Sequence, residues 1–498
     1  MKTKLPVLFF LAALLLALML LPAYAQEAGN LSDGPFQYRV EDGYAVLVGY
    51  RGPGGDIVIP FELGGYPVNR IGIMDILSFT DIVSITVPQG VTTIDEGAFQ
   101  SLDFESIHLP DSVVSLGSYT FQNCTKLTSV RLPGGLTAIP EGMFHLCESL
   151  TSIELPESVT SIGNSAFMQS GLASIVIPEG VTSIEGYAFF SCVGLTSVTL
   201  PDSLESIGED AFGHCYNLKN INIPLRIRSI SEGLFARCDR LESIDLPDGL
   251  ESIGNYAFAM CASVKSIRIP SKVTTIAPNT FMNCMNLAYV NIPAGTTSIG
   301  NGAFSGCISL TSITIPEGVS SIGENAFFKC VGLKTMRIPA SVTVIDQQAF
   351  GGCTSLHAMD VVKDNPVYEQ MDGVLFDKAQ KMLHTFPAGY TNLFYKVPGG
   401  TLKIGDYAFS LALNLITVKL PKGTKEIGSH AFENCLSLDR VTIPRSTAKI
   451  SDNAFDGVDK QLLIQTTRVS YADTYAKENG FQSEAGFFED EYDLLDLY

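Results

Sequence analysis

The feature that most constrains this chain is an internal repeat of 23 residues. Between Cys192 and Cys353 a cysteine returns at this interval, and each stands in the same short segment, as in residues 211–215 (Ala-Phe-Gly-His-Cys). A fixed period of roughly 20–50 residues is typical of a solenoid, in which each repeat forms one coil and packs only on its neighbours. A length of 498 residues would otherwise suggest about three globular domains. The repeat therefore decides the architecture.

Phenylalanines mark the coils along most of the chain. Successive members are 23 residues apart, except for two intervals of 22 and one of 59. The members are Phe99, Phe121, Phe144, Phe167, Phe189, Phe212, Phe235, Phe258, Phe281, Phe304, Phe327, Phe350, Phe409, Phe432 and Phe455. We expect a core that grows coil by coil and is interrupted once, within the longest interval.

Each repeat reads L-x-S-I-x-I-P-x-x-V-x-x-I-G-x-x-A-F-x-x-C, as residues 310–330 show. Strand alternation directs Ile313 and Ile315 inward, and Pro316 ends the strand because it has no N–H for a ladder hydrogen bond. Gly323 is expected to permit the turn that follows. The spacing of the final alanine, phenylalanine and cysteine suits one helical turn on the far side.

This pattern resembles the BspA-like bacterial family of leucine-rich repeat proteins. The resemblance is carried by strand leucines such as Leu195 and Leu218, by the strand end Ile315-Pro316 and by the A-F-x-x-C turn. It extends over about residues 71–455. The chain departs from the general leucine-rich repeat in having proline after the strand, where asparagine or cysteine is usual.

The resemblance implies an α/β solenoid, a right-handed leucine-rich repeat superhelix of 23-residue coils. It would have a β-sheet on one face, short helical turns on the other and a β-rich N-terminal cap. Secreted or cell-surface location and an adhesive or binding role are also implied.

Seven segments are expected along the chain. Alternating β-branched and aromatic residues between glycines and prolines predict strands before the repeats, where an array needs an atypical end to cover its core. Tyr471, Thr474 and Tyr475 have helical spacing and Asn479-Gly480 is a stop signal, so a terminal helix is predicted. The segments are a signal peptide at 1–25, a β-rich cap at 26–70, repeats at 71–360, an enlarged irregular coil or hairpin insert at 361–397, repeats at 398–460, a C-terminal cap at 461–482 and an acidic tail at 483–498.

The first residues predict export. Lys2 and Lys4 precede an apolar run at 5–21, and residues 23–25 (Ala-Tyr-Ala) form a small-residue cleavage site. The apolar run is nearly long enough for a membrane anchor, so an uncleaved anchor is the alternative. The mature chain is expected to be secreted, extracellular or at the cell surface, without membrane insertion. A formal net charge of −20 repels phosphate backbones, so no nucleic-acid partner is expected.

The residue pattern contains no recognisable catalytic, cofactor or metal site, and we expect no enzyme. The six histidines are scattered, and His214 beside Cys215 is the nearest approach to ligand spacing. The eleven cysteines are expected to be buried free thiols, because stacked neighbours point the same way and cannot reach relaxed disulfide geometry. Crosslinks are the alternative in an exported chain.

Two segments could act outside the regular core. Asp372-Gly373 lies between apolar runs and predicts a hairpin in the insert. The insert is either one enlarged β-rich coil or a projection that binds a partner. The acidic residues 489–493 form either a disordered tail or a partner-docking segment.

The outward strand positions form the most informative surface. One column is mostly serine and threonine, and the next is mixed. In the mixed column, Arg131 with Glu154 and Asp245 with Arg268 are expected to pair between adjacent strands. Small polar residues are also ordinary on strand surfaces without a ligand.

Tyr289, flanked by Arg268 and Asn291, is the aromatic residue of these columns and the candidate centre for partner contact. The sequence and the resemblance together favour an exported, non-catalytic binding protein, acting in adhesion or in recognition of a host protein or glycan through the solenoid surface. The expected partner is an extracellular protein or glycan, and the chain is expected to be a monomer. The alternative is a structural spacer or assembly component of the cell surface.

Overall fold

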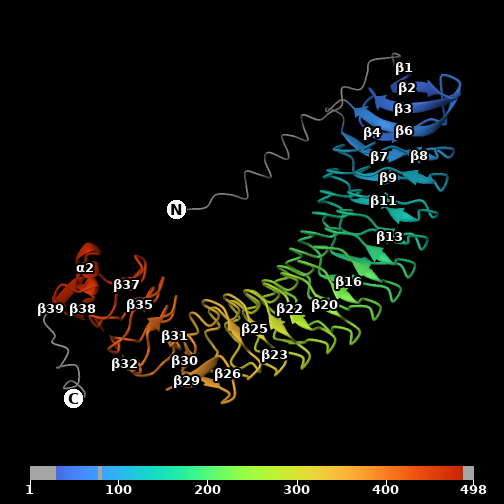
Figure 1. The fold of residues 1–498 in the computed structure, drawn as a ribbon. Coiled ribbons are helices and arrows are strands. Elements are labelled where there is room, and N and C mark those ends of the chain that lie inside the picture. Colours follow the sequence, from blue (N-terminus) through green and yellow to red (C-terminus); the bar gives the residue numbers. More distant parts are fainter. Residues whose placement is uncertain (1–29, 77–80, 486–498) are drawn as a thin grey trace.

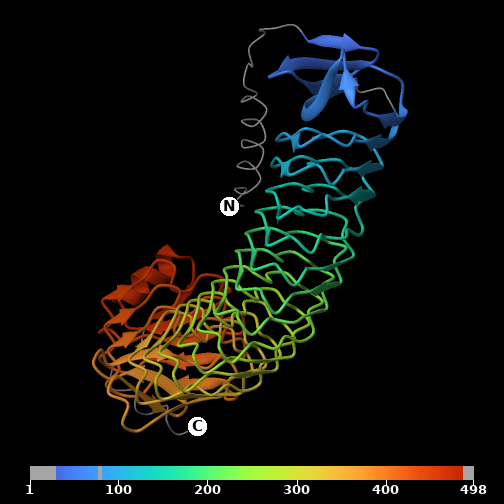
Figure 2. The same ribbon diagram turned by 90° about the vertical axis from the view of Figure 1, so that its right-hand side faces the viewer.

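A computed structural model of the chain shows a long, curved stack of coils between a β-rich N-terminal region and a helix near the other end (Figure 1). The structure describes residues 30–76 and 81–485. The predicted signal peptide at 1–25 and the acidic residues 489–493 lie outside the described residues. A view turned by 90° shows the coils following one another as layers (Figure 2). The predicted solenoid of 23-residue coils is confirmed.

In most coils the first strand lies at the segment before the proline, often Ser-Ile or Ser-Val, whereas residues 151–156, 241–247 and 311–316 form no strand there. These strands pair in parallel with identical positions aligned, so that Ser174 lies opposite Ser197 and Ser197 opposite Asn220. We call this stack the first ladder. Its strands are β4 (Gly55–Val58), β7 (Ile82–Thr86), β9 (Ser106–His108), β11 (Ser129–Arg131), β14 (Ser174–Val176), β16 (Ser197–Thr199), β18 (Asn220–Ile221), β21 (Ser266–Arg268), β23 (Tyr289–Asn291), β26 (Thr335–Ile338), β28 (Ala358–Val361), β32 (Phe394–Lys396), β34 (Thr417–Lys419), β36 (Arg440–Thr442), β38 (Leu463–Thr466) and β39 (Gln482–Ala485).

A second ladder, which the sequence did not predict, lies at the Ser-Ile pair before the glycine. Most of its strands are two residues long and pair in parallel, as Ser298 does with Ser321. Its strands are β6 (Tyr66–Ile76), β8 (Thr93–Ile94), β10 (Ser115–Leu116), β12 (Ala138–Ile139), β13 (Ser161–Ile162), β15 (Ser183–Ile184), β17 (Ser206–Ile207), β19 (Ser229–Ile230), β20 (Ser252–Ile253), β22 (Thr275–Ile276), β24 (Ser298–Ile299), β25 (Ser321–Ile322), β27 (Val344–Ile345), β31 (Met382–Thr385), β33 (Lys403–Ile404), β35 (Glu426–Ile427) and β37 (Lys449–Ile450).

The glycine after the second strand lets coils approach closely and does not supply a special turn conformation. Gly323, expected to permit the turn, is absent from the residues with positive φ. A Cβ on it would lie 2.7 Å from the backbone nitrogen of Asn301 in the preceding coil. Gly300 has the same relation to Pro278, also at 2.7 Å. At Gly300 and Gly323 backbone atoms of the preceding coil occupy the space of a Cβ, whereas other coils carry a larger residue at the same position, such as Glu185 or Asp346.

The far side of the coils differs from the expected short helical turns. Within A-F-x-x-C, the residue before the cysteine has positive φ, for example 60° at His214 and 62° at Met260. A left-handed residue ends a helix. The segment is therefore a tight turn, in which the backbone N–H of Cys215 donates to the carbonyl oxygen of Phe212 at 3.3 Å.

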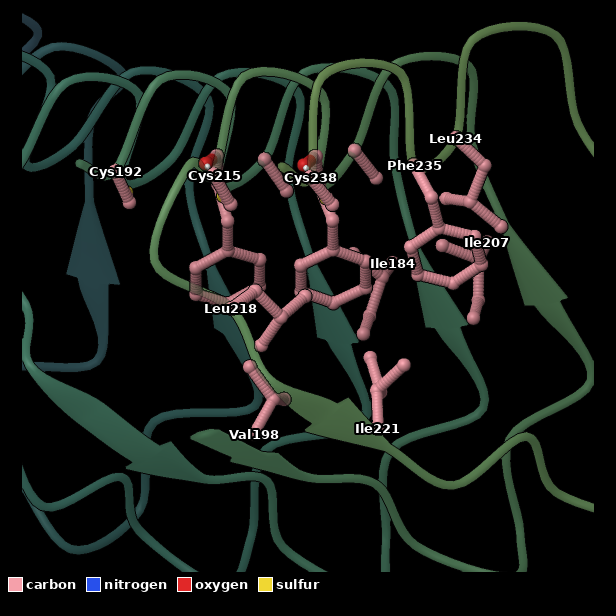
Figure 3. Close-up of a cluster of buried hydrophobic side chains, with 14 of the residues drawn as sticks. Ile184, Cys192, Val198, Ile207, Cys215, Leu218, Ile221, Leu234, Phe235 and Cys238 are labelled. Carbon is pink, nitrogen blue, oxygen red and sulfur yellow. Dashed lines mark hydrogen bonds between the residues drawn. The ribbon is translucent and has the colours of Figure 1, made fainter. Parts of the chain in front are cut away.

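The phenylalanine column forms a continuous stack of rings through the core. From Phe99 to Phe350, neighbouring ring centroids are 5.2–6.0 Å apart and the ring planes are within 19° of parallel. Figure 3 shows rings of this stack between the cysteine turns and strand residues such as Val198 and Ile221. Aromatic pairs contribute about 0.5–1.5 kcal/mol each beyond the area that they bury.

The cysteines are buried free thiols, as predicted. Each also donates a hydrogen bond, from Sγ to the carbonyl oxygen of the phenylalanine in the preceding coil, at 3.0–3.3 Å. Cys215, for example, donates to Phe189 at 3.2 Å. The thiol therefore connects successive coils in addition to filling space.

The N-terminal region begins as an antiparallel sheet and turns into the array. Its additional strands are β1 (Leu31–Asp33), β2 (Phe36–Glu41), β3 (Tyr44–Tyr50) and β5 (Glu62–Leu63). Strand β2 pairs antiparallel with β1 and β3, and β3 pairs in parallel with β6 of the second ladder. The hairpin thus covers the first coil and provides an edge on which the second ladder builds.

The insert repeats this arrangement in the middle of the chain. Strands β29 (Tyr368–Met371) and β30 (Val374–Asp377) form an antiparallel hairpin, as predicted, and β30 pairs antiparallel with β31. The turn residues Asp372 and Gly373 have φ of 54° and 78°, close to 49° and 81° at Asp42 and Gly43 between β2 and β3. Strand β31 then starts the second ladder of the last coils by pairing in parallel with β33.

The hydrophobic core divides at this hairpin. Leu375 belongs to the core of the preceding coils, whereas Val374 and Phe376 on the same strand belong to a separate core that continues to Phe481. We call residues 30–360 the first array and residues 361–485 the second array. Near its end, before β39, the second array contains α2 (Tyr471–Glu478), capped by Ser470, which confirms the predicted terminal helix. Among the residues that the structure describes, no helix is long and apolar enough to cross a membrane.

Candidate functional site

The structure brings the three predicted contact residues together on β21 and β23. Tyr289 lies opposite Ser266, and Arg268 lies opposite Asn291, in the parallel register of the first ladder. The Tyr289 side chain is 62% exposed. Strand alternation places it outward, with Val290 buried behind it.

The two polar neighbours of Tyr289 are engaged within the chain. The Arg268 Nη1 donates to Asp248 Oδ1 at 2.8 Å, and both side chains are largely exposed. The Asn291 amide bonds the backbone of the preceding coil, because its Oδ1 accepts from the Ile269 N–H at 3.0 Å and its Nδ2 donates to the Ile269 carbonyl oxygen at 3.3 Å. Asn291 therefore joins two coils, and Tyr289 is the group of the three that faces solvent without such a bond.

The predicted ion pairs of the mixed column do not form. Arg131 pairs with Asp111 at 3.4 Å and Arg268 with Asp248 at 2.8 Å. Their expected partners, Glu154 and Asp245, lie in coils whose first segment is not a strand. Because these segments make no ladder hydrogen bonds, their outward side chains are not held opposite those of the adjacent strand.

A true cross-strand pair forms where the ladder is intact. Arg337 and Asp360 lie opposite each other on β26 and β28, with an N–O distance of 3.6 Å. Both side chains are largely exposed, so this pair contributes little to stability.

The first ladder has an open stretch beside β11. Segment 152–155 makes no strand pairing with β11, and a hollow of about 560 Å³ lies between them. Its lining includes the side chains of Ser129, Arg131 and Glu154. The sequence reasoning missed this hollow because the repeat motif is intact at residues 150–156 and carries no signal of the break.

The described part of the chain, residues 30–76 and 81–485, holds no group of three or more His, Cys, Asp or Glu side chains that could bind a metal. The His214 Nδ1 lies 3.0 Å from the Tyr216 hydroxyl, and burial lowers the pKa of His214. The adjacent Cys215 points into the core, where burial raises the pKa of its thiol. A protonated thiol that donates to a carbonyl is neither a nucleophile nor a metal ligand.

Comparison with known proteins shows which family and which solved structures share this architecture. A family profile described as the BspA type leucine rich repeat region (6 copies) matches residues 75–194, 160–288, 274–387 and 390–483. A leucine-rich repeat protein from Bacteroides ovatus is 25% identical in sequence, with a TM-score of 0.51, and the match covers 93% of this chain and 100% of that one. A leucine rich cell surface protein from Faecalibacterium prausnitzii is 21% identical, with a TM-score of 0.36 and coverage of 94% and 97%. A search of curated protein sequences found no match.

Proposed function

Because this chain belongs to the BspA type leucine-rich repeat family, we propose that it is an exported, non-catalytic scaffold that binds an extracellular protein or glycan. Adhesion or host recognition is the corresponding role at the cell surface. The first ladder would provide the binding face, with Tyr289 at the centre of contact. The single observation that carries this proposal is that Tyr289 is 62% exposed on a strand paired in register with β21.

Physical reasons support a tyrosine on such a strand as a contact residue. Its ring offers a large apolar surface with only two rotatable bonds, so little conformational entropy is lost on binding. The hydrogen bonds from Asn291 to Ile269 fix the strand that carries the ring. A partner would therefore meet a preorganised surface.

The test is to replace Tyr289 with alanine and to measure binding of the mature chain to immobilised extracellular matrix proteins and to glycans. We expect Tyr289→Ala to weaken binding at least tenfold, since aromatic residues at the centre of an interface commonly carry 2 kcal/mol or more. Val176→Ala is the matched control, because Val176 is also an exposed outward residue of the first ladder, on β14. Equal binding by Tyr289→Ala and the parent chain would rule out this face.

The second candidate is a structural spacer of the cell surface. It is favoured by the bonds that Arg268 and Asn291 make within the chain, which leave few free polar groups beside Tyr289. A spacer predicts no saturable binding by the arrays themselves, so the same binding experiment separates the two functions.

A further inference from the structure

A polar cleft lies where the insert joins the two arrays. Its volume is about 270 Å³. One wall comes from the end of the first array at 345–351, another from the insert at Asp377 and Gln380 and from β31, and the third from the second array at 403–410. The cleft exists because the insert replaces a regular coil at this point, and it has no counterpart in a uniform stack.

Hydrogen bonds hold the polar walls of the cleft in place. The buried Asp377 carboxylate accepts from the Gln380 backbone N–H at 2.9 Å and from its Nε2 at 3.1 Å. Gln347 Nε2 donates to Asp406 Oδ2 at 3.1 Å, which joins the two arrays across an interval of 59 residues. The walls are therefore fixed before any ligand arrives, which limits the entropy cost of binding.

The floor of the cleft combines apolar rings with one buried hydroxyl. The Tyr368 side chain is 96% buried, since its exposed fraction is 4%, and its hydroxyl oxygen accepts from the Ile345 N–H at 2.9 Å. The hydroxyl hydrogen has no acceptor among the hydrogen bonds of the described residues. Burial lowers the pKa of His384 beside it, although the His384 Nε2 lies 2.9 Å from the Ile345 carbonyl oxygen, a contact that acts in the opposite direction. Phe386 adds an apolar surface.

The charges of the lining select the class of ligand. Three carboxylates, those of Asp346, Asp377 and Asp406, disfavour an anion. A cation is disfavoured too, because Lys403 shares the cleft and the oxygens of Asp377 and Asp406 already accept hydrogen bonds. A neutral ligand with many hydroxyl groups can donate to the carboxylate of Asp346, which has no hydrogen bond within the described residues, and can accept from amide N–H and phenol O–H groups.

We propose that this cleft binds one or two sugar rings of a neutral glycan. Sugar rings present hydroxyl groups at their edges and C–H groups on their faces, which match polar walls and an apolar floor. The volume lies just below the roughly 300–1,000 Å³ of sites for drug-sized ligands, so a short unit fits and a long chain does not. The inference rests on the proposed binding function and names a site for the glycan away from Tyr289.

The test measures binding of a panel of sugars to the full mature chain by saturation-transfer NMR and calorimetry. The panel contains methyl glycosides and disaccharides of neutral hexoses and N-acetylhexosamines, with heparin as the anionic probe and a lysine-rich peptide as the cationic probe. We expect Asp346→Ala and Gln348→Ala to weaken sugar binding about tenfold or more. Neither side chain makes a hydrogen bond within the described chain, so both variants should keep the parent melting temperature.

Matched controls separate the cleft from the strand face. Glu185 occupies the column of Asp346 in a regular coil, four residues before a core phenylalanine, so Glu185→Ala should leave sugar binding unchanged. Tyr289→Ala should also leave it unchanged. Sugar binding that falls only in the two cleft variants supports the proposal.

Three results would overturn the cleft assignment. These are the absence of sugar binding by the parent chain, sugar binding that Asp346→Ala and Gln348→Ala do not change, and preferential binding of the cationic or anionic probe in the cleft. If matrix proteins still bind through Tyr289, only the cleft assignment fails. If neither sugars nor matrix proteins bind, the proposed function fails with it.

Discussion

At the scale of single residues, Gly300 lets its coil pack closely on the preceding coil. A Cβ at position 300 would lie 2.7 Å from the Pro278 nitrogen and 2.9 Å from the Ala277 carbonyl carbon, which are backbone atoms that cannot turn aside. The Gly300 N–H also donates to the Ile276 carbonyl oxygen at 2.8 Å, so the coils cannot separate without stretching that bond. We expect Gly300→Ala to lower the free energy of unfolding by about 1–3 kcal/mol, as overpacking does.

The control for this change lies in the same coil. Gly295 has no positive φ, and a Cβ there would be 3.7 Å from the Ser271 carbonyl oxygen, which is ordinary contact. Gly295→Ala should therefore leave the free energy of unfolding unchanged or raise it by about 0.4–1 kcal/mol, because alanine lowers the conformational entropy of the unfolded chain. Urea unfolding followed by circular dichroism measures both, and an equal effect of the two variants would contradict the close-approach explanation.

The buried thiols predict a dependence of stability on pH. Burial raises the pKa of Cys192 to about 11 and that of Cys124 to about 12. In the unfolded chain the pKa of a cysteine thiol is about 8.5. Above that pH the unfolded state holds fewer protons than the native state, so the free energy of unfolding falls as pH rises and the loss continues until the native pKa is reached.

We therefore expect the urea midpoint to decrease between about pH 8.5 and 11, and to be insensitive to the thiols below about pH 8. Replacing Cys124 and Cys192 together with alanine should reduce that slope, while the loss of their hydrogen bonds to Phe99, Phe167 and Ser170 lowers stability at every pH. An unchanged slope in this double variant would show that other groups cause the pH dependence. Native protein should also react with thiol reagents only through unfolding.

At the scale of elements, one asparagine holds the insert onto the first array. The Asn365 Nδ2 donates to the carbonyl oxygens of Pro339 and Val342 at 2.8 and 2.9 Å, and its Oδ1 accepts from the N–H groups of Val367 and Tyr368 at 2.9 and 2.7 Å. The residue is 1% exposed. Asn365→Ala would leave four backbone groups without these partners, and we expect it to cost about 3 kcal/mol or more.

The neighbouring Asp364 provides the control, because its side chain is exposed and Asp364→Ala should change stability by less than about 0.5 kcal/mol. Thermal unfolding measures both variants, and limited proteolysis shows where the chain opens. The expected result for Asn365→Ala is early cleavage in the insert at 361–397. A loss of stability equal to that of Asp364→Ala would show that the asparagine is not the anchor.

Sequence periodicity predicted the elements whose signal lies within one repeat. The hairpin at Asp372-Gly373 follows from its turn residues, and α2 follows from helical spacing. In the repeat at 310–316, Ile315 is buried as predicted, but Ile313 is only partly buried and residues 311–316 form no strand. The second ladder was missed because a strand of two residues is too short to show alternation. The break beside β11 was missed because the repeat motif at residues 150–156 is intact and carries no signal of it.

The same limit applies to the candidate sites. The exposure of Tyr289 follows from strand alternation. The hydrogen bond of the Asn291 side chain, by contrast, depends on which backbone atoms of the preceding coil face it. The cleft could not be predicted, because Gln347 and Asp406 come together only once the insert is folded between them. A site formed by side chains of neighbouring coils can be predicted only when the register between those coils is known, and the structure supplies that register.

At the scale of the whole molecule, the chain consists of two arrays that meet at one hairpin. The phenylalanine stack of the first array ends at Phe350, and stacking in the second array starts with Phe409 against Phe432, whose ring centroids are 4.9 Å apart. Both arrays begin with an antiparallel hairpin that carries an Asp-Gly turn. In a repeat protein, stability is approximately a sum of coil terms and interfaces between neighbours. Cooperativity is therefore weakest where the core divides.

We accordingly expect equilibrium unfolding in two steps, one for each array, and independent folding of residues 361–485 when they are produced alone. The control is to divide the chain at residue 294, within a regular coil. This cut separates the Phe281 ring from the Phe304 ring, whose centroids are 5.4 Å apart, and the Cys307 Sγ from the Phe281 carbonyl oxygen. Fragments cut there should be less stable than those cut at the insert, because each exposes a stacked core face. Circular dichroism and tyrosine fluorescence during urea unfolding give the two transitions. A single transition with coincident probes, or an unfolded 361–485 fragment, would mean that the hairpin transmits cooperativity as a regular coil does.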